Sequence, residues 1–145
     1  MPLLLPFLPA FIAGTLAVLV FHQSALGLLH LVGLTPRTPF VLDGVPPLGV
    51  PQLLSLMFWG GVWGLALLPL LRPLGDARCW LRGLVLGALG PTLVSWFIVA
   101  PLKGLPLAGG WQPAAMATGL IVNAAWGLGL VALLRLAQRA GIPGG

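Results

Sequence analysis

The chain has 145 residues, of which 59% are hydrophobic and 6% are charged, and its formal net charge is +5. Because soluble domains carry roughly 25% charged residues, this composition excludes a protein whose surface is covered by water. The length suits one domain, so we predict a single integral membrane domain over residues 1–145, surrounded by the lipid bilayer. The basic residues flank apolar segments, as in membrane proteins, and we therefore expect no nucleic-acid partner.

Four apolar segments lie at about residues 7–32, 50–71, 79–101 and 112–135. Crossing the hydrocarbon core of a bilayer takes roughly 20 helical residues. A helix satisfies its own backbone hydrogen bonds in lipid, and none of the segments alternates in polarity as barrel strands do. We therefore predict an all-α fold, a four-helix transmembrane bundle. The first segment is too long for a signal peptide and lacks the basic residues that precede one, so we expect it to be retained.

The connections between these segments differ in character. Residues 34–51 contain five prolines, which rule out a regular helix there. We expect this segment to fold across one mouth of the bundle, with Arg37 and Asp43 as partners, although an extended connector fits the sequence equally well. In the short second connection, Asp76 is placed to cap the third helix.

The basic residues predict the orientation of the bundle. In a four-helix topology one side of the membrane carries Arg72, Arg78, Arg82, Arg135 and Arg139, and the other side carries Arg37 and Lys103. Lys and Arg are in excess on cytoplasmic loops. We therefore expect both termini and the second connection to lie in the cytoplasm.

A faint internal repeat relates the second and fourth segments. Residues 63–72 (WGLALLPLLR) match residues 126–135 (WGLGLVALLR) without a gap. Such a repeat would make the fold two parallel helical hairpins related by an axis along the membrane normal. Recurrence of Gly, Leu, Trp and Arg at membrane edges explains the match equally well.

Uncharged polar residues gather in the outer halves of the four predicted helices. At 100° per residue they form one stripe on each helix. Polar groups in lipid normally face the interior of a bundle, so we predict one outward-facing polar pocket. Its candidate ligand-binding residues are His22, Gln23, His30, Gln52, Ser55, Thr92, Ser95 and Asn123.

Close helix packing is predicted by three pairs of small residues. They are Gly60–Gly64, Gly83–Gly87 and Ala115–Gly119, each spaced four residues apart. Pro91 stands in the middle of the third helix and should kink it.

The candidate residues predict binding rather than catalysis. His22 and His30 lie about 12 Å apart along a helix, so they cannot ligate one metal ion together. The chain has one cysteine, no glutamate and two aspartates that lie outside the helices. We therefore predict no catalytic residue, metal site or cofactor. We expect a non-enzymatic protein that binds a small ligand or serves as an accessory subunit of a membrane complex. The alternative is a small oligomeric channel or transporter that uses His22.

Three stretches carry a resemblance to a protein family. Residues 95–111, residues 122–130 and the stretch from Phe21 to Pro51 are similar to stretches of short bacterial multi-pass inner-membrane proteins of unknown function. The resemblance implies a compact multi-pass protein in the cell inner membrane. It implies no activity, because none is assigned to that family.

Overall fold

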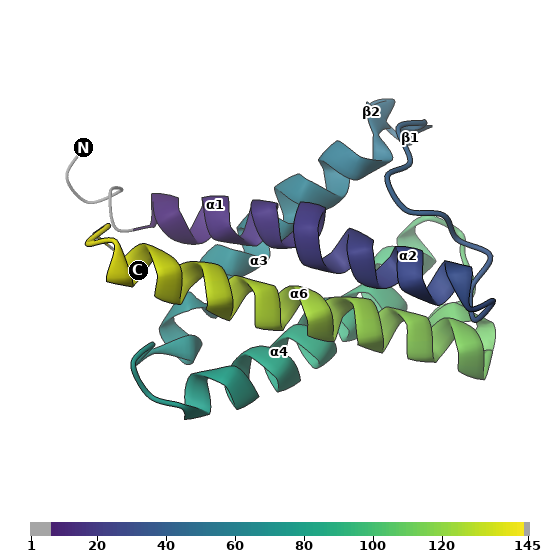
Figure 1. Cartoon of the computed structure of the whole chain (residues 1–145). Coiled ribbons are helices and arrows are strands. Elements are labelled where there is room, and N and C mark those ends of the chain that lie inside the picture. Colours follow the sequence, from purple (N-terminus) through teal and green to yellow (C-terminus); the bar gives the residue numbers. More distant parts are fainter. Residues whose placement is uncertain (1–6, 144–145) are drawn as a thin grey trace.

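The computed structural model describes residues 7–143 and shows an all-α bundle (Figure 1). Within these residues, four helices are long and apolar enough to cross a membrane. The first consists of α1 (Leu8–Ala17), the π-helical segment η1 (Val18–His22) and α2 (Gln23–Leu31). The second is α3 (Gln52–Leu71). The third consists of α4 (Arg78–Val94), the π-helical segment η2 (Ser95–Val99) and α5 (Ala100–Leu102), and the fourth is α6 (Pro113–Arg139). The predicted four-helix fold is therefore confirmed.

The helix boundaries differ from the predicted ones by more than one residue at two places. The fourth helix continues to Arg139 rather than ending at residue 135, because Leu136, Ala137 and Gln138 are good helix formers. The second helix begins at Gln52 rather than at residue 50. Val50 and Pro51 instead form β2, which pairs antiparallel with β1 (Gly44–Val45).

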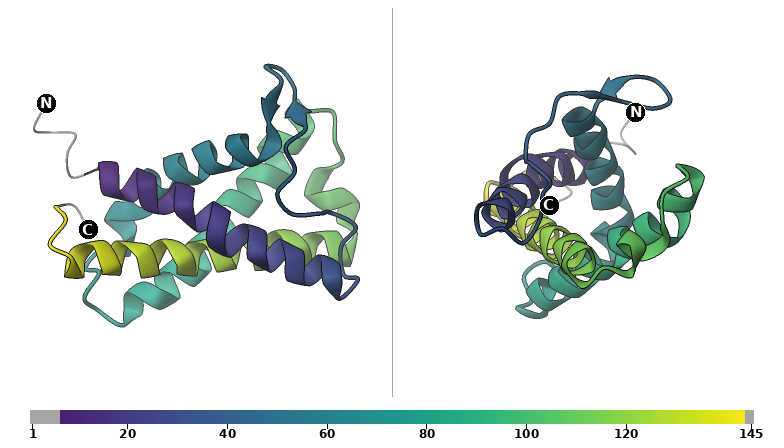
Figure 2. Two further views of the ribbon diagram at one scale, coloured as in Figure 1. Left: turned by 45° about the horizontal axis from the view of Figure 1, so that its top comes forward. Right: turned by 90° about the vertical axis from the view of Figure 1, so that its right-hand side faces the viewer.

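The two ends of the bundle carry different connections (Figures 1 and 2). The start of α1, the connection between α3 and α4, and the end of α6 lie together, and we call this the arginine-rich end. The opposite, distal end carries residues 32–51 and residues 103–112, which include the short helix η3 (Leu107–Trp111). The five arginines that were predicted to share a side therefore do so.

Residues 32–51 run from α2 to α3 around the distal end (Figure 2). The β1–β2 hairpin makes this segment partly regular, which the prolines alone did not predict. Within residues 7–143, no ion pair joins Arg37 to Asp43. The predicted cap is confirmed, because the Asp76 carboxylate accepts a hydrogen bond from the Arg78 amide at 3.0 Å.

Glycines let the helices approach closely in two hairpins. The first span packs on α3, where a Cβ on Gly60 would lie 2.8 Å from the carbonyl oxygen of Gly14. The third span packs on α6, where a Cβ on Gly87 would lie 2.6 Å from the Cα of Gly127. Such contacts leave no room for a side chain, so the predicted role of the glycine pairs in α3 and α4 is confirmed.

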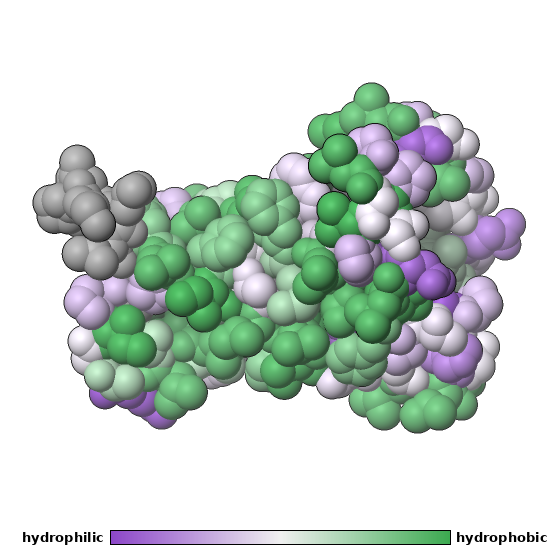
Figure 3. Space-filling view, turned by 90° about the horizontal axis from the view of Figure 1, so that it is seen from above, coloured by the Kyte–Doolittle hydropathy of each residue, from purple (hydrophilic) through white to green (hydrophobic). Residues whose placement is uncertain are grey.

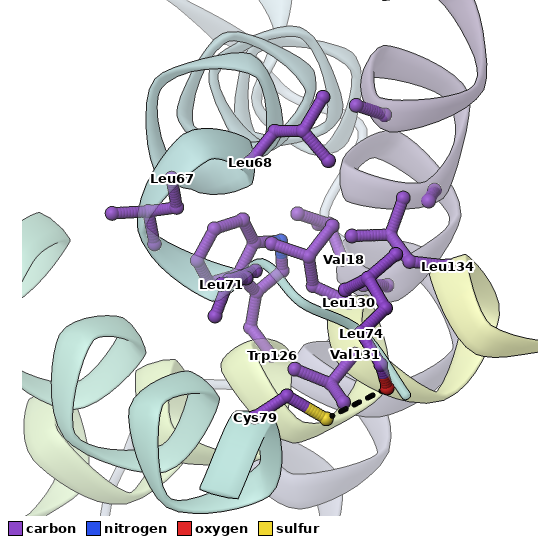
Figure 4. Close-up of a cluster of buried hydrophobic side chains, with 13 residues drawn as sticks. Val18, Leu67, Leu68, Leu71, Leu74, Cys79, Trp126, Leu130, Val131 and Leu134 are labelled. Atoms are coloured by element: carbon purple, nitrogen blue, oxygen red, sulfur yellow. Dashed lines mark hydrogen bonds between the residues drawn. The ribbon is translucent and has the colours of Figure 1, made fainter. Parts of the chain in front are cut away.

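The hydrophobic core lies between α1, α3 and α6, in the half toward the arginine-rich end (Figure 4). Its members include Ala10, Val18, Leu67, Leu68, Leu71, Leu74, Cys79, Trp126, Leu130, Val131 and Leu134. The surface outside this core is also largely apolar (Figure 3), as it must be where lipid replaces water.

The four helices are unequally buried. About the same share of the first and fourth spans is buried, 39% in each, against 28% of the second and 17% of the third. The first and fourth spans pack along each other, whereas α3 and α4 touch at few positions. One of these is the ring of Trp63, which would lie 3.2 Å from a Cβ on Gly90. Toward the distal end the two helices separate (Figure 2).

Two membrane-spanning helices contain a π-helical turn, η1 near the middle of the first span and η2 in the distal half of the third. Pro91 lies inside α4 without ending it, and η2 begins four residues later. The kink expected at Pro91 stays a prediction, whereas neither π turn was predicted. Such turns insert one extra residue into the helix and occur frequently at functional sites.

Candidate functional site

His22 and Gln23 form a buried pair at the junction of η1 and α2. Their exposed fractions are 6% and 2%. Consecutive residues of an α-helix point about 100° apart, and both can face inward on a widely covered face, as Leu67 and Leu68 do on α3. The π turn Val18–His22 ends at this pair, and both side chains lie in the interior.

The hydrogen bonds of this pair fix its protonation pattern. The Gln23 carbonyl oxygen accepts a bond of 2.7 Å from the backbone N–H of Phe40. The Gln23 amide nitrogen therefore faces His22 and donates to its Nδ1 at 3.1 Å. Because Nδ1 accepts, the neutral imidazole carries its proton on Nε2. A metal ion at Nε2 would need the other tautomer, so the bonding does not favour a metal or haem ligand here.

His30 lies about two helical turns beyond His22 and also bonds to the segment that connects α2 to α3. Its Nδ1 donates to the carbonyl oxygen of Thr35 at 3.1 Å, and the Thr35 hydroxyl accepts from the backbone N–H of Arg37 at 3.2 Å. Between the two histidines, Gly27 leaves room for Pro39. Residues 35–40 therefore lie along α2, and we call them the strap.

Thr92 and Asn123 form a second polar group, between α4 and α6. The Asn123 amide donates to the Thr92 hydroxyl at 2.9 Å, and that hydroxyl donates to the carbonyl oxygen of Gly119 at 3.3 Å. Thr92 is 1% exposed. These bonds link the two helices of one hairpin.

The remaining candidates lie apart from both groups. Gln52 and Ser55 are half-buried on α3, and Ser95 is exposed on η2. Within residues 7–143, no side-chain hydrogen bond joins any of these three to another residue, and none joins His22 to Asn123. The structure thus brings His22, Gln23 and His30 together under the strap, brings Thr92 and Asn123 together, and leaves three candidates separate.

The residues that sequence reasoning did not assign to a site are the tryptophans of the repeat. Trp126 is 1% exposed, and its Nε1 donates to the carbonyl oxygen of Gly14 at 2.9 Å. Its repeat partner, Trp63, contacts Gly90. Each tryptophan therefore contacts the first helix of the other hairpin. The sequence feature that could have indicated these two contacts is the Trp-Gly pair that recurs at residues 63–64 and 126–127.

Comparison with known proteins does not identify a family for this chain. No protein-family model, curated protein or solved structure matches the chain. In the described part of the chain, no group of three His, Cys, Asp or Glu side chains is close enough to hold a metal ion. The arrangement of the helices therefore carries the functional proposal.

Proposed function

We propose that the chain is a non-enzymatic, multi-pass protein of the bacterial inner membrane that serves as a subunit of a larger membrane assembly. Its termini lie in the cytoplasm, since the arginine-rich end has the charge of a cytoplasmic face. Its separated helices α3 and α4 receive a transmembrane helix of the partner. The observation that carries this proposal is the open side between α3 and α4, which touch at few positions, and the third span is the least buried of the four, at 17%.

The internal repeat supports this assignment. If α3 corresponds to α6, the interface between α3 and the third span corresponds to the interface between α6 and the first span, and the two can be compared. Between α6 and the first span, Trp126 closes the interface with a hydrogen bond to Gly14. Between α3 and α4, the equivalent Trp63 packs on Gly90 but makes no hydrogen bond within residues 7–143. The helices are therefore packed together at the interface between α6 and the first span, whereas the interface between α3 and α4 is open toward the distal end.

The side chains along the open side suit another helix. Ser55 and Trp59 share a helical face with Trp63, which contacts α4. Trp59 is 57% exposed, and Ser95 on η2 is also exposed. Helices in membranes associate through close packing and hydrogen bonds from small polar residues, and Ser55 and Ser95 offer such hydroxyls.

A channel or transporter that uses His22 gains no support from this geometry. His22 is buried under the strap, and its Nδ1 is occupied by the Gln23 amide. A proton relay needs both ring nitrogens to exchange protons, and here the Gln23 amide would first have to release Nδ1.

Native mass spectrometry of the protein extracted from its own membrane tests the proposal. We expect a complex heavier than the 15.1 kDa protomer. We expect it to dissociate in Ser55→Phe, which enlarges a side chain on the face of α3 that carries Trp63. The matched control is Leu28→Phe, because Leu28 is 64% exposed on α2, away from the open side. Whole multiples of the protomer mass would identify the partner as a second copy. A protomer alone, or one with only a small bound molecule, would contradict the proposal.

A further inference from the structure

The arginine-rich end concentrates positive charge on a small area. It carries Arg72, Arg78, Arg82, Arg135 and Arg139. The one acidic side chain among residues 72–78 is Asp76, which lies 3.9 Å from Arg82. Five arginines against one aspartate leave a formal side-chain charge of +4 at this end. Orientation in the membrane requires such an excess but requires no particular arrangement of it.

The connection between α3 and α4 is nevertheless held in one conformation. Leu74 is 2% exposed, and its carbonyl oxygen accepts a hydrogen bond from the Cys79 thiol at 3.3 Å (Figure 4). The guanidinium of Arg82 donates to the carbonyl oxygen of Arg72 at 2.9 Å. From α6, Arg135 donates to the Cys79 sulfur at 3.5 Å. Each end of the connection is thus tied to a neighbouring helix.

This ordered connection forms one wall of a shallow hollow. The hollow is lined by Arg72, Pro73, Leu74 and Gly75 of the connection and by Gln138 of α6. A guanidinium and an amide donate to the oxygens of a phosphate group, while the exposed Pro73 offers apolar contact beside them. Arg78 follows Gly75 by three residues and Arg139 follows Gln138 directly; both are exposed, and neither forms an ion pair within residues 7–143.

A tryptophan places the hollow at the height of lipid headgroups. Trp80 is 39% exposed in the first turn of α4, and the Arg135 guanidinium lies 5.6 Å from the centre of its ring. Tryptophans of membrane proteins gather where the hydrocarbon meets the headgroups. A group bound in the hollow would therefore lie among headgroups rather than in bulk water.

We propose that the hollow at the arginine-rich end binds the phosphodiester headgroup of an anionic phospholipid. Arg72 and Gln138 contact the phosphate oxygens, and Arg78 and Arg139 supply the surrounding positive charge. Basic pockets beside transmembrane helices bind anionic headgroups by this chemistry. The site is distinct from the open side between α3 and α4, so it stands whether or not a partner helix binds there.

The test compares lipid binding by the full-length protein and two double variants in detergent. Native mass spectrometry measures the retention of phosphatidylglycerol and of phosphatidylcholine. Arg78→Gln with Arg139→Gln removes two charges at the hollow. Arg37→Gln with Lys103→Gln removes the same charge at the distal end. Each basic side chain near an anionic surface strengthens binding by about fivefold. We therefore expect the first variant to bind phosphatidylglycerol about 25-fold more weakly and the second to bind it normally.

Three results would overturn the assignment. Equal affinity for the two lipids would exclude charge recognition. Equal loss in both double variants would show a dependence on net charge alone. Competition by inorganic phosphate at a concentration equal to that of the lipid would make the ligand a free phosphate rather than a headgroup. Thermal unfolding in lipid-free detergent checks that both variants are folded.

Discussion

Adding one methyl group at Gly127 tests the glycine contact that holds the second hairpin. In Gly127→Ala, the new Cβ would collide with the carbonyl oxygen of Gly83 and lie 2.9 Å from the Cα of Gly87. Carbon atoms pack at about 3.5–4.0 Å, so the two backbones must separate by close to 1 Å. A gap of that size forfeits roughly a quarter to a half of each affected contact. Overpacking of this kind costs about 1–3 kcal/mol, and the helix preference of alanine over glycine offsets about 0.8–1.0 kcal/mol of it. We therefore expect a net loss of up to about 2 kcal/mol of unfolding free energy.

The matched control is Gly119→Ala, two turns away on the same helix. There the Cβ would lie 3.5 Å from the Trp96 indole nitrogen and 3.7 Å from a Thr92 methyl group, which are ordinary contacts. Alanine also favours a helix over glycine by about 0.8–1.0 kcal/mol, so this variant should be neutral or more stable. Reversible unfolding in mixed micelles gives both values. Equal stability of the two variants would refute the close backbone contact.

Three further predictions use the same unfolding assay or hydrogen exchange. Thr92→Val removes two hydrogen bonds between α4 and α6 and should cost about 1.2 kcal/mol, at about 0.6 kcal/mol for each bond between membrane helices. Combined with Asn123→Leu it should cost less than the sum of the single changes, because the two residues share one bond; additive costs would argue against that bond. Gln23→Leu should speed hydrogen exchange at the Phe40 amide and spare the Gln52 amide, which donates to Asp43 instead. Unchanged exchange at Phe40 would mean that the strap does not depend on Gln23. Trp126→Phe should destabilise the bundle more than Trp63→Phe, since only Trp126 donates a hydrogen bond across its interface; the reverse order would contradict the comparison of the two interfaces.

The sequence predicted the helices well because hydropathy and length decide which segments can lie in a bilayer. Gly60, Gly64, Gly83 and Gly87 also marked the close contacts, because nothing larger fits between backbones. The same reasoning could not place the tryptophans. Trp59 and Trp126 both lie in apolar helices, yet Trp59 is 57% exposed and Trp126 is 1% exposed. Lipid, a partner helix and the core all favour apolar side chains, so hydropathy does not separate them.

The prediction that the polar stripes meet in one pocket assumed that every helix is a regular α-helix. The π turn ending at His22 alters which residues face inward, and no residue type in Val18–His22 signals it. The partners of Gln23 and His30 are also backbone atoms of the strap. Any residue has such atoms, so sequence patterns cannot reveal these bonds. Asp76, in contrast, could be placed because its cap depends on a local side chain.

Site-specific photocrosslinking in the native membrane tests the central claim that another helix occupies the open side between α3 and α4. A photoreactive phenylalanine derivative at position 59 should yield a protein adduct, because Trp59 is 57% exposed on the face of α3 that carries Trp63, which contacts α4. The same group at position 28 should react with lipid alone, because Leu28 is 64% exposed on α2. Lipid adducts alone at both positions would contradict the account.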